Sequence, residues 1–290
     1  MTAPFPTHKQ EEWRYADLDA LKPVWEQFAE PVTLTVGAGE SLEEIWLPGA
    51  DDVQLRRVQL ALEQGAKARL FVLNNAPVYG RVELEVSLEE GAEFELFAAN
   101  IGTGLATNEI VTNVKHLGVG GGSRQTIRSV LNGKAVGSYL GKVEVARGAQ
   151  QTDAEQSVKA MLLDRGAIAN CKPELEIFAD DVKCAHGASV GELDAMQLFY
   201  AESRGLDPAS ARALLLEGFV MGLWDTASDA HAIREASREV LRTVSILPAG
   251  AAGGEGDRSA QLSGGGAGPS VSPLARPATS PSLRDREEER

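Results

Sequence analysis

The regular alternation of apolar and polar residues limits the fold of this chain more than any other feature of its sequence. From about residue 31 to residue 182, runs such as VELEVSL at 82–88 and VEV at 143–145 carry an apolar side chain at every second position. A period of two is typical of β-strands, whose successive side chains point to opposite faces. No long helical pattern lies between the runs. We therefore predict a mainly β protein built from short strands.

A repeated turn indicates how these strands are connected. A Gly-Ala pair follows a charged or polar residue at Gly65, Gly91, Gly148 and Gly166. Adjacent copies lie roughly 18 to 26 residues apart, close to the length of one coil of a β-solenoid. We interpret them as one turn that is reused at each corner of such a solenoid. An antiparallel β-sandwich is the alternative that this pattern leaves open.

Helical patterns flank the β region. Before it, apolar residues recur every three to four positions between Trp13 and Trp25, which predicts a small helical segment broken by Pro23. After it, Asp194 and Asp207 are typical helix N-caps, and the residues that follow carry apolar side chains at helical spacing. The folded part of the chain is therefore predicted to end in short helices.

These patterns predict four segments: a helical segment over residues 1–30, a β-solenoid core over 31–190, a helical domain over 191–247 and a disordered tail over 248–290. The tail consists mainly of Gly, Ser, Pro and Ala, which bury too little apolar area to offset the entropy of ordering. In the helical domain, Phe199 and Tyr200 are expected in the core, because aromatic residues at helical spacing usually lie there. A partner-binding role for these two aromatics is the alternative.

Charge and hydropathy narrow the classes of function. The formal net charge is −14, the wrong sign for a protein that neutralises the phosphates of a nucleic acid. No window reaches the roughly 18 apolar residues of a membrane-spanning helix, and the first residues lack the apolar core of a signal peptide. We therefore expect a cytoplasmic protein that binds neither nucleic acid nor membrane. Its two cysteines are too few for a disulfide framework.

The densest group of chemically active side chains lies in ADDVKCAHGASVGELD, where the β pattern meets the helical one. Cys184 and His186 are two positions apart, so on an extended strand both side chains point to one face and could bind a soft metal ion. A zinc site would need two more ligands, and Cys171 with Asp181 is the nearest supply. The alternative is that Cys184 is a small buried apolar residue and His186 a capping or hydrogen-bonding residue.

Enzymatic catalysis finds little support in the sequence. No serine lies in a G-x-S-x-G turn, and neither cysteine has a sequence context that favours activation. A solenoid enzyme acting on polysaccharide would need a row of acids or arginines on one strand face, and no such row is visible. We therefore expect a protein that is not an enzyme; a stand-alone metal-binding solenoid module is a further alternative.

Three stretches of the chain resemble the SufB/SufD family of iron–sulfur cluster assembly proteins. Residues 173–219, from PELEIFADDVKCAHGASVGELD to ALLLEGF, resemble the family's C-terminal part. EEWRYADL near residue 11 resembles its N-terminal signature, and GKVEVARGAQQTDAEQSVKAMLL resembles its last solenoid coils. The segment His186-Gly187-Ala188 is more similar to SufD than to SufB, which usually has His-Glu-Ala there.

The resemblance implies a right-handed parallel β-helix with helical ends. It also implies a SufD-like subunit that pairs with a SufB-like protein, binds a SufC-like ATPase, and helps to assemble and transfer nascent iron–sulfur clusters. The family's motif histidine, which lies at the SufB–SufD interface as a cluster ligand or its support, corresponds to His186, and the motif's cysteine to Cys184. The residues implied in binding the ATPase lie at the end of the first C-terminal helix and in the second: Arg204, Leu214, Leu215 and Phe219.

Several consequences of the resemblance stay open at this point. The nascent cluster would be shared with the partner, and none is expected in the isolated chain. The family complex is also linked to reduced FAD, although no residue pattern here marks a flavin site. A homodimer is an alternative to the heterocomplex. SufB carries a scaffold cysteine where this chain has roughly Gly166-Ala167, so this chain could not supply that thiol. Family members are also longer than this chain, so residues 30–110 are expected to hold fewer coils.

Overall fold

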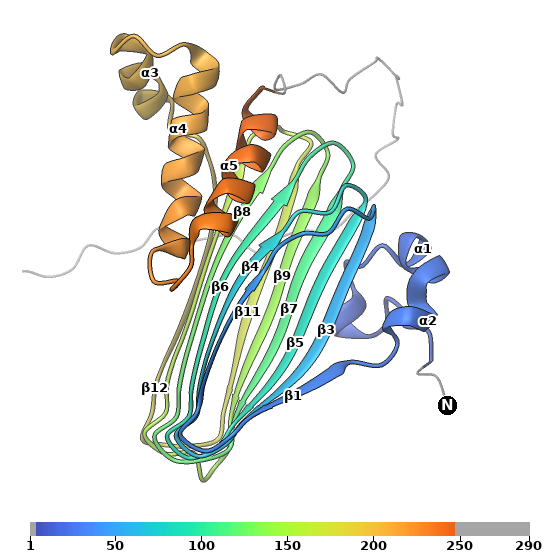
Figure 1. Ribbon diagram of the computed structural model, residues 1–290, viewed down its shortest axis with the longest axis vertical. Helices are drawn as coiled ribbons and strands as arrows, with labels where there is room; N and C mark the ends of the chain where they lie inside the picture. Colours follow the sequence, from blue (N-terminus) through green and yellow to red (C-terminus); the bar gives the residue numbers. More distant parts are fainter. Residues whose placement is uncertain (1–3, 247–290) are drawn as a thin grey trace, which may run out of the picture. The chain divides into compact units, whose positions relative to one another are not determined.

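A computed structural model describes residues 4–246. Its strands form two parallel six-stranded sheets, and successive strands of the chain alternate between them (Figure 1). The odd-numbered strands form one sheet in the order β1-β3-β5-β7-β9-β11, and the even-numbered strands form the other in the order β2-β4-β6-β8-β10-β12. Each coil thus gives one strand to each sheet. The predicted β-solenoid is confirmed, and the antiparallel sandwich is excluded.

The strands of the two sheets have the following bounds. The odd sheet contains β1 (Val32–Val36), β3 (Val53–Leu62), β5 (Tyr79–Leu88), β7 (Thr107–His116), β9 (Val136–Val145) and β11 (Ile168–Ile177). The even sheet contains β2 (Ser41–Trp46), β4 (Lys67–Asn74), β6 (Glu93–Gly102), β8 (Gly122–Leu131), β10 (Asp153–Leu162) and β12 (Lys183–Glu192).

The main core fills the space between the two sheets. Leu84, Val86 and Leu88 of β5 are buried there, whereas the intervening Glu85 is only partly covered. Parallel strands covered by helices on both faces usually have continuous apolar runs. Here one face of each sheet lines the core and much of the other meets solvent, which explains the alternation seen in the sequence.

A ladder of turn residues joins neighbouring coils at the corner where an odd strand leads into the next even one. Gly39, Gly65, Gly91, Gly120 and Gln151 occupy this corner with φ between 61° and 70°. The N–H of each donates to a carbonyl in the next coil; Gly65 N, for example, lies 2.8 Å from Glu90 O. The repeated Gly-Ala pairs therefore mark more than one turn, because Gly166 lies at the opposite corner, between β10 and β11.

The N-terminal segment consists of the short helical turns η1 (Glu11–Trp13), α1 (Leu18–Leu21), η2 (Lys22–Val24) and α2 (Trp25–Phe28). Trp13 and Trp25 meet edge to face, with ring centroids 5.7 Å apart, and share a cluster with Tyr79 of β5. Glu11 reaches as far as the last coil, where its carboxylate lies 2.7 Å from Nζ of Lys172. The helical segment thus covers part of the outer face of the odd sheet.

The C-terminal region contains α3 (Ala195–Ser203), α4 (Pro208–Val220), η3 (Met221–Trp224) and α5 (His231–Ile246). Asp194 accepts from two N–H groups of α3, and Asp207 does so for α4, as expected of N-caps. Trp224 packs with Phe71 of β4 in a second core cluster between these helices and the even sheet. Figure 1 shows α4 and α5 beside this sheet. The predicted tail over 248–290 lies outside the described residues.

Candidate functional site

The last coil of the solenoid ends in open strand edges. Within the described residues, β11 and β12 each pair with one neighbour only, β9 and β10 respectively. Such an edge leaves N–H and C=O groups free to pair with another strand. Large apolar side chains are exposed at the same end of the solenoid: Ile168, Ile177, Phe178 and Val190. This combination defines a surface suited to an added strand, which we call the open edge.

Cys184 and His186 both belong to the inward-facing row of β12. Cys184 is in register with Ala154 of β10, and His186 with Gln156. Both β10 residues are buried in the solenoid interior, and side chains at equivalent positions of neighbouring coils share a face. The predicted placement of Cys184 and His186 on one face is therefore what the structure has. His186 is exposed because no coil covers it among the described residues.

The two cysteines lie on different sheets of the last coil. Cys171 on β11 is in register with Tyr139, and both Cys171 and Cys184 pack partly buried against the main core. Burial raises the pKa of each thiol, so both favour the protonated form. Across residues 4–246, no three or more His, Cys, Asp or Glu side chains come together closely enough to hold a metal ion. Asp181 and Cys171 therefore do not complete a zinc site with Cys184 and His186.

An inward-facing row of the even sheet leads to His186 and is polar at its last three positions. Five residues in register across the even sheet follow one another from β4 to β12: Leu70, Leu96, Gln125, Gln156 and His186. Oε1 of Gln125 accepts from the hydroxyls of Thr112, at 2.7 Å, and Tyr139, at 3.0 Å. Gln156 and His186 also line a surface pocket of about 340 Å³ along β10 and β12. The sequence pattern alone does not reveal this row.

The residues implied in ATPase binding differ in their surroundings. Arg204 ends α3 and is exposed, with Nη2 3.0 Å from the Tyr200 hydroxyl. Leu214 is 56% exposed, and Leu215 is partly covered. Phe219 packs against the second core cluster, and the Arg128 guanidinium lies 5.9 Å from its ring centroid. Leu214 and Arg204 are thus open to a partner, whereas Phe219 also holds α4 against the solenoid.

The first C-terminal helix carries exposed apolar side chains, two of which were predicted from their helical spacing to lie in the core. Phe199 is 66% exposed and Tyr200 is 59% exposed, so the expectation that they are core residues is wrong. Met196, also on α3, is exposed too. Helix α3 packs on α4, and only Ala201 of α3 is buried. The exposed apolar residues of α3 and α4 form a second candidate contact surface.

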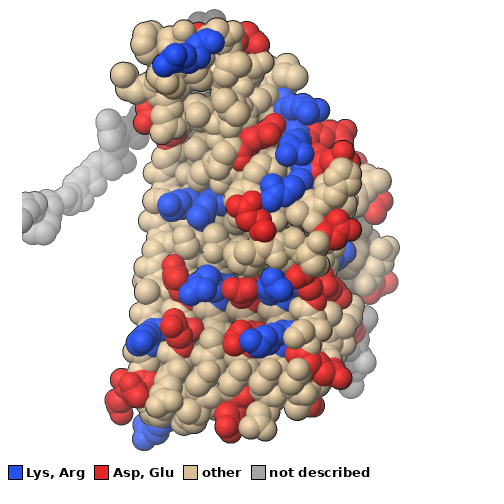
Figure 2. Space-filling model, turned by 60° about the vertical axis from the view of Figure 1, so that its left-hand side comes forward, with Lys and Arg blue, Asp and Glu red and all other residues tan. Residues whose placement is uncertain are grey.

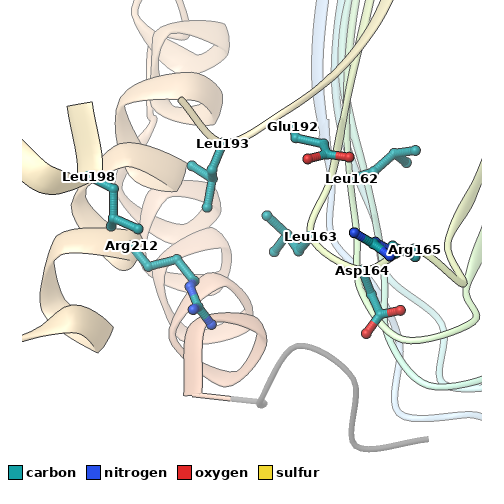
Figure 3. A pocket seen from close by; sticks show the side chains of 8 residues that line it. All are labelled: Leu162, Leu163, Asp164, Arg165, Glu192, Leu193, Leu198 and Arg212. Carbon is teal, nitrogen blue, oxygen red and sulfur yellow. The ribbon is translucent and has the colours of Figure 1, made fainter. Parts of the chain in front are cut away.

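Helices α3 and α4 form a helical hairpin, and a pocket of about 440 Å³ separates it from the last coils. Figure 3 shows Leu163, Asp164 and Arg165 at the turn after β10 on one side, and Leu198 and Arg212 of the helices on the other. The chain passes from β12 to α3 through Leu193 and Asp194 alone. The hairpin is thus joined to the open edge by a short connection with space beside it.

Charged residues outside these two surfaces are interleaved by sign. Figure 2 shows Lys and Arg next to Asp and Glu across the face that it displays, with no large patch of one sign. Ion pairs between neighbouring coils join charges of opposite sign, as in Lys67–Glu93 at 3.0 Å and Arg69–Glu43 at 3.4 Å. Exposed pairs of this kind each contribute little to stability.

Fold and site together define a two-sheet parallel β-solenoid protein with an open strand edge and an adjoining helical hairpin. The chain belongs to the SufBD family, because residues 33–219 match the family model described as SUF system FeS cluster assembly, SufBD core domain. None of the helices over residues 4–246 is long and apolar enough to cross a membrane.

Three relatives are named as iron–sulfur cluster assembly proteins. The chain is 31% identical over 176 residues to an iron–sulfur cluster assembly SufBD family protein of Synechocystis, covering 60% of this chain and 39% of the relative. It is 36% identical over 107 residues to SufD of Escherichia coli, covering 37% and 25%. It is 32% identical over 120 residues to SufD of Bacillus subtilis, covering 41% and 28%. The chain thus spans about two fifths or less of the length of these relatives.

Proposed function

We propose that this chain is a SufD-like subunit of an iron–sulfur cluster assembly scaffold. Family membership and the relatives named SufD support this role. The structural observation that carries the proposal is the open edge, where His186 ends an inward-facing row next to unpaired strand groups. In this role the chain binds partners and cargo and catalyses no turnover of its own.

The proposed first partner is a SufB-like protein that pairs with the open edge. An added strand would satisfy the free N–H and C=O groups of β12 and cover apolar side chains such as Phe178 and Val190. The same pairing would cover His186 and place it between the two subunits. The nascent cluster is the cargo of this interface, with His186 and Cys184 as ligands or supports and the remaining ligands supplied by the partner.

The proposed second partner is a SufC-like ATPase that binds the helical hairpin. Phe199 and Leu214 offer exposed apolar contacts, and Arg204, bonded to the Tyr200 hydroxyl, adds a charged group at the end of α3. Dimerisation of two ATPase subunits would pull on α3 and α4. Because Leu193 and Asp194 connect α3 directly to β12, such a movement would reach the interface around His186. Nucleotide binding would in this way change access to the cargo.

Co-expression tests the proposal. The tagged chain is produced with SufB-like and SufC-like proteins of the same cell, and the purified material is analysed by size exclusion with mass measurement. We expect one complex that contains a single copy of this chain. A folded chain that associates with neither protein, or only with a second copy of itself, would overturn the heterocomplex; metal bound to the isolated chain would favour a stand-alone metal module instead.

Two variants assign the interface within this experiment. Val190→Lys places a charge on the open edge and should abolish pairing with the SufB-like protein. Leu105→Lys changes a side chain that is 80% exposed at a turn between β6 and β7, and should leave the complex unchanged. His186→Ala should assemble normally and contain less iron and sulfide. Normal cluster content in His186→Ala would remove this residue from the proposed site.

A further inference from the structure

From β4 onward, one inward-facing row of the even sheet changes from apolar to polar towards the open edge. In the inward row of the even sheet, Leu70 and Leu96 of the earlier coils give way to Gln125, Gln156 and His186 in the last three. Gln125 is held by the hydroxyls of Thr112 and Tyr139. A buried polar group without a partner destabilises the fold, so polar side chains in a solenoid core require an explanation.

Gln156 is the member of this row whose side-chain amide has no partner at either end, whereas Gln125 lacks a partner only at Nε2. Its side chain is 1% exposed, and neither Oε1 nor Nε2 has a hydrogen-bond partner. On the side of the open edge its register neighbour is His186, and the two residues line the same pocket. The unpaired carboxamide therefore lies one strand away from an imidazole whose surroundings are incomplete in the isolated chain.

The same sheet already contains a hydrogen bond of the required kind. Asn74 of β4 and Asn100 of β6 are register neighbours, both buried, and Nδ2 of Asn74 donates to Oδ1 of Asn100 at 3.1 Å. Side chains in register on adjacent parallel strands are thus close enough to bond in this sheet. Gln and His are longer than Asn, so the pair Gln156–His186 has at least the same reach.

We propose that Gln156 is a positioning residue for His186. In the assembled complex, Oε1 of Gln156 accepts from one ring N–H of His186, which leaves the lone pair of the other ring nitrogen directed at the cargo. A neutral imidazole has one donor and one acceptor nitrogen, so an acceptor on one side fixes both the tautomer and the ring orientation. This role rests on the proposed function, because it takes His186 as a cluster ligand.

The tautomer of His186 gives a direct test. The chain has only four histidines, so selective labelling with ¹⁵N-histidine allows the ring nitrogens to be assigned by nuclear magnetic resonance in the cluster-free complex with the SufB-like partner. We expect one dominant tautomer in the wild-type complex and a mixture in Gln156→Leu. Gln156→Glu retains an acceptor oxygen and should restore the single tautomer. Gln125→Leu removes the deeper amide of the row and should leave His186 unchanged.

Cluster content provides the second readout. After reconstitution, Gln156→Leu should retain roughly tenfold less iron and sulfide than the wild type at limiting iron, the usual scale for loss of a group that orients a ligand. An assembled Gln156→Leu complex with the wild-type tautomer and cluster content would overturn the role of Gln156. If Gln156→Leu does not assemble, the tautomer of His186 is measured in Gln156→Glu and Gln125→Leu instead. A mixture of tautomers in Gln156→Glu, or an altered tautomer in Gln125→Leu, would overturn the role of Gln156.

The failure of the two ideas can be separated. Suppose that His186→Ala retains its cluster while Gln156→Leu still changes the tautomer. The hydrogen bond between Gln156 and His186 then exists, but His186 is not a cluster ligand. This outcome contradicts both the assignment of His186 as a ligand and the positioning role of Gln156. If His186→Ala loses the cluster and Gln156→Leu behaves as wild type, the proposed function stands and the role of Gln156 alone is wrong.

Discussion

Arg81 and Glu109 form an ion pair in the solenoid that is closed to solvent: Nη1 of Arg81 lies 3.0 Å from Oε2 of Glu109, and both side chains are 0% exposed. Tyr79 donates its hydroxyl to the same carboxylate oxygen at 2.8 Å, and burial raises the pKa of Tyr79, so the phenol remains a donor. The guanidinium carbon of Arg81 lies 3.7 Å from the centroid of the Trp13 ring. The pair therefore links the N-terminal helical segment to the strands β5 and β7.

Removing one partner of this pair should be costly. Glu109→Ala leaves a buried guanidinium that is only partly compensated by Glu83, and we expect the free energy of unfolding to fall by about 3–5 kcal/mol. Lys67→Ala breaks the exposed Lys67–Glu93 pair and should cost less than about 1 kcal/mol. Urea unfolding followed by circular dichroism measures the free energy of unfolding of both variants. Similar losses in the two variants would contradict a special role of the buried Arg81–Glu109 pair in stability.

Gln151 should be replaceable by glycine with a gain in stability. It has φ 61° and is the only non-glycine residue of positive φ in the described part of the chain, at a corner where four other coils have glycine. A side chain in this conformation costs about 1–2 kcal/mol, partly offset by the flexibility that glycine adds to the unfolded chain. We expect Gln151→Gly to stabilise the protein by up to about 1 kcal/mol.

The matched control for this prediction is Gly91→Ala, which introduces a Cβ at the equivalent corner of an earlier coil, where φ is 65°. It should destabilise the protein by about 1 kcal/mol or more. Thermal unfolding of the two variants gives the comparison. A lower melting temperature for Gln151→Gly than for the wild type would contradict the prediction that its backbone conformation is strained.

Acid should destabilise the fold through His116. This residue is fully buried, its Nε2 lies 2.9 Å from Oγ of Ser123, and burial lowers its pKa from 6.5 to about 4. The unfolded chain therefore binds a proton at a higher pH than the folded one. Stability that is complete above pH 6.5 should decline as the pH falls towards 4, by up to about 3 kcal/mol from this group.

The pH dependence of His116→Gln tests this assignment. Its free energy of unfolding should depend less on pH between 6.5 and 4 than that of the wild type. His231→Gln changes a histidine whose side chain is 80% exposed and should leave the slope as it is. An unchanged slope in His116→Gln would assign the acid sensitivity to other groups.

Two substitutions in the helical hairpin should separate binding from stability. Leu214→Asp alters an exposed side chain and should weaken ATPase binding without a change in melting temperature. Phe219→Asp puts a charge into the second core cluster, so we expect it to lower the melting temperature as well. Binding measured by calorimetry, together with thermal unfolding, distinguishes the two effects. Full ATPase affinity in a folded Leu214→Asp variant would remove this surface from the proposed interface.

The sequence was most informative where the pattern and the burial agree. In β5 the run VELEVSL has apolar residues on one face only, so its inward side is unambiguous. The stretch SRQTIRS in β8 has polar residues in both phases, and only the register of the sheet shows that Gln125 points inward. The polar row that ends at His186 was therefore invisible from sequence, although the shared face of Cys184 and His186 was predictable from their spacing.

The C-terminal helices show a second limit. Helix α4 contains Leu214, Leu215 and Leu216 in succession, and apolar residues in succession do not define which face is buried. Leu216 is buried, whereas Leu214 is open to solvent. Phe199 and Tyr200 were expected in the core because their spacing is helical, but α3 packs against α4 and leaves both exposed. Tertiary packing, which periodicity cannot supply, decides these positions.

The turn ladder and the strand register also determine how such a molecule changes in length. Each coil bonds to the coils directly above and below it, and stacking adds about 4.8 Å per coil. A whole coil can be inserted or deleted in the middle while the chemistry of the last coil stays as it is. The distance between β2 and the open edge at β12 can therefore change only in steps of one whole coil. Such a change does not alter what the open edge recognises.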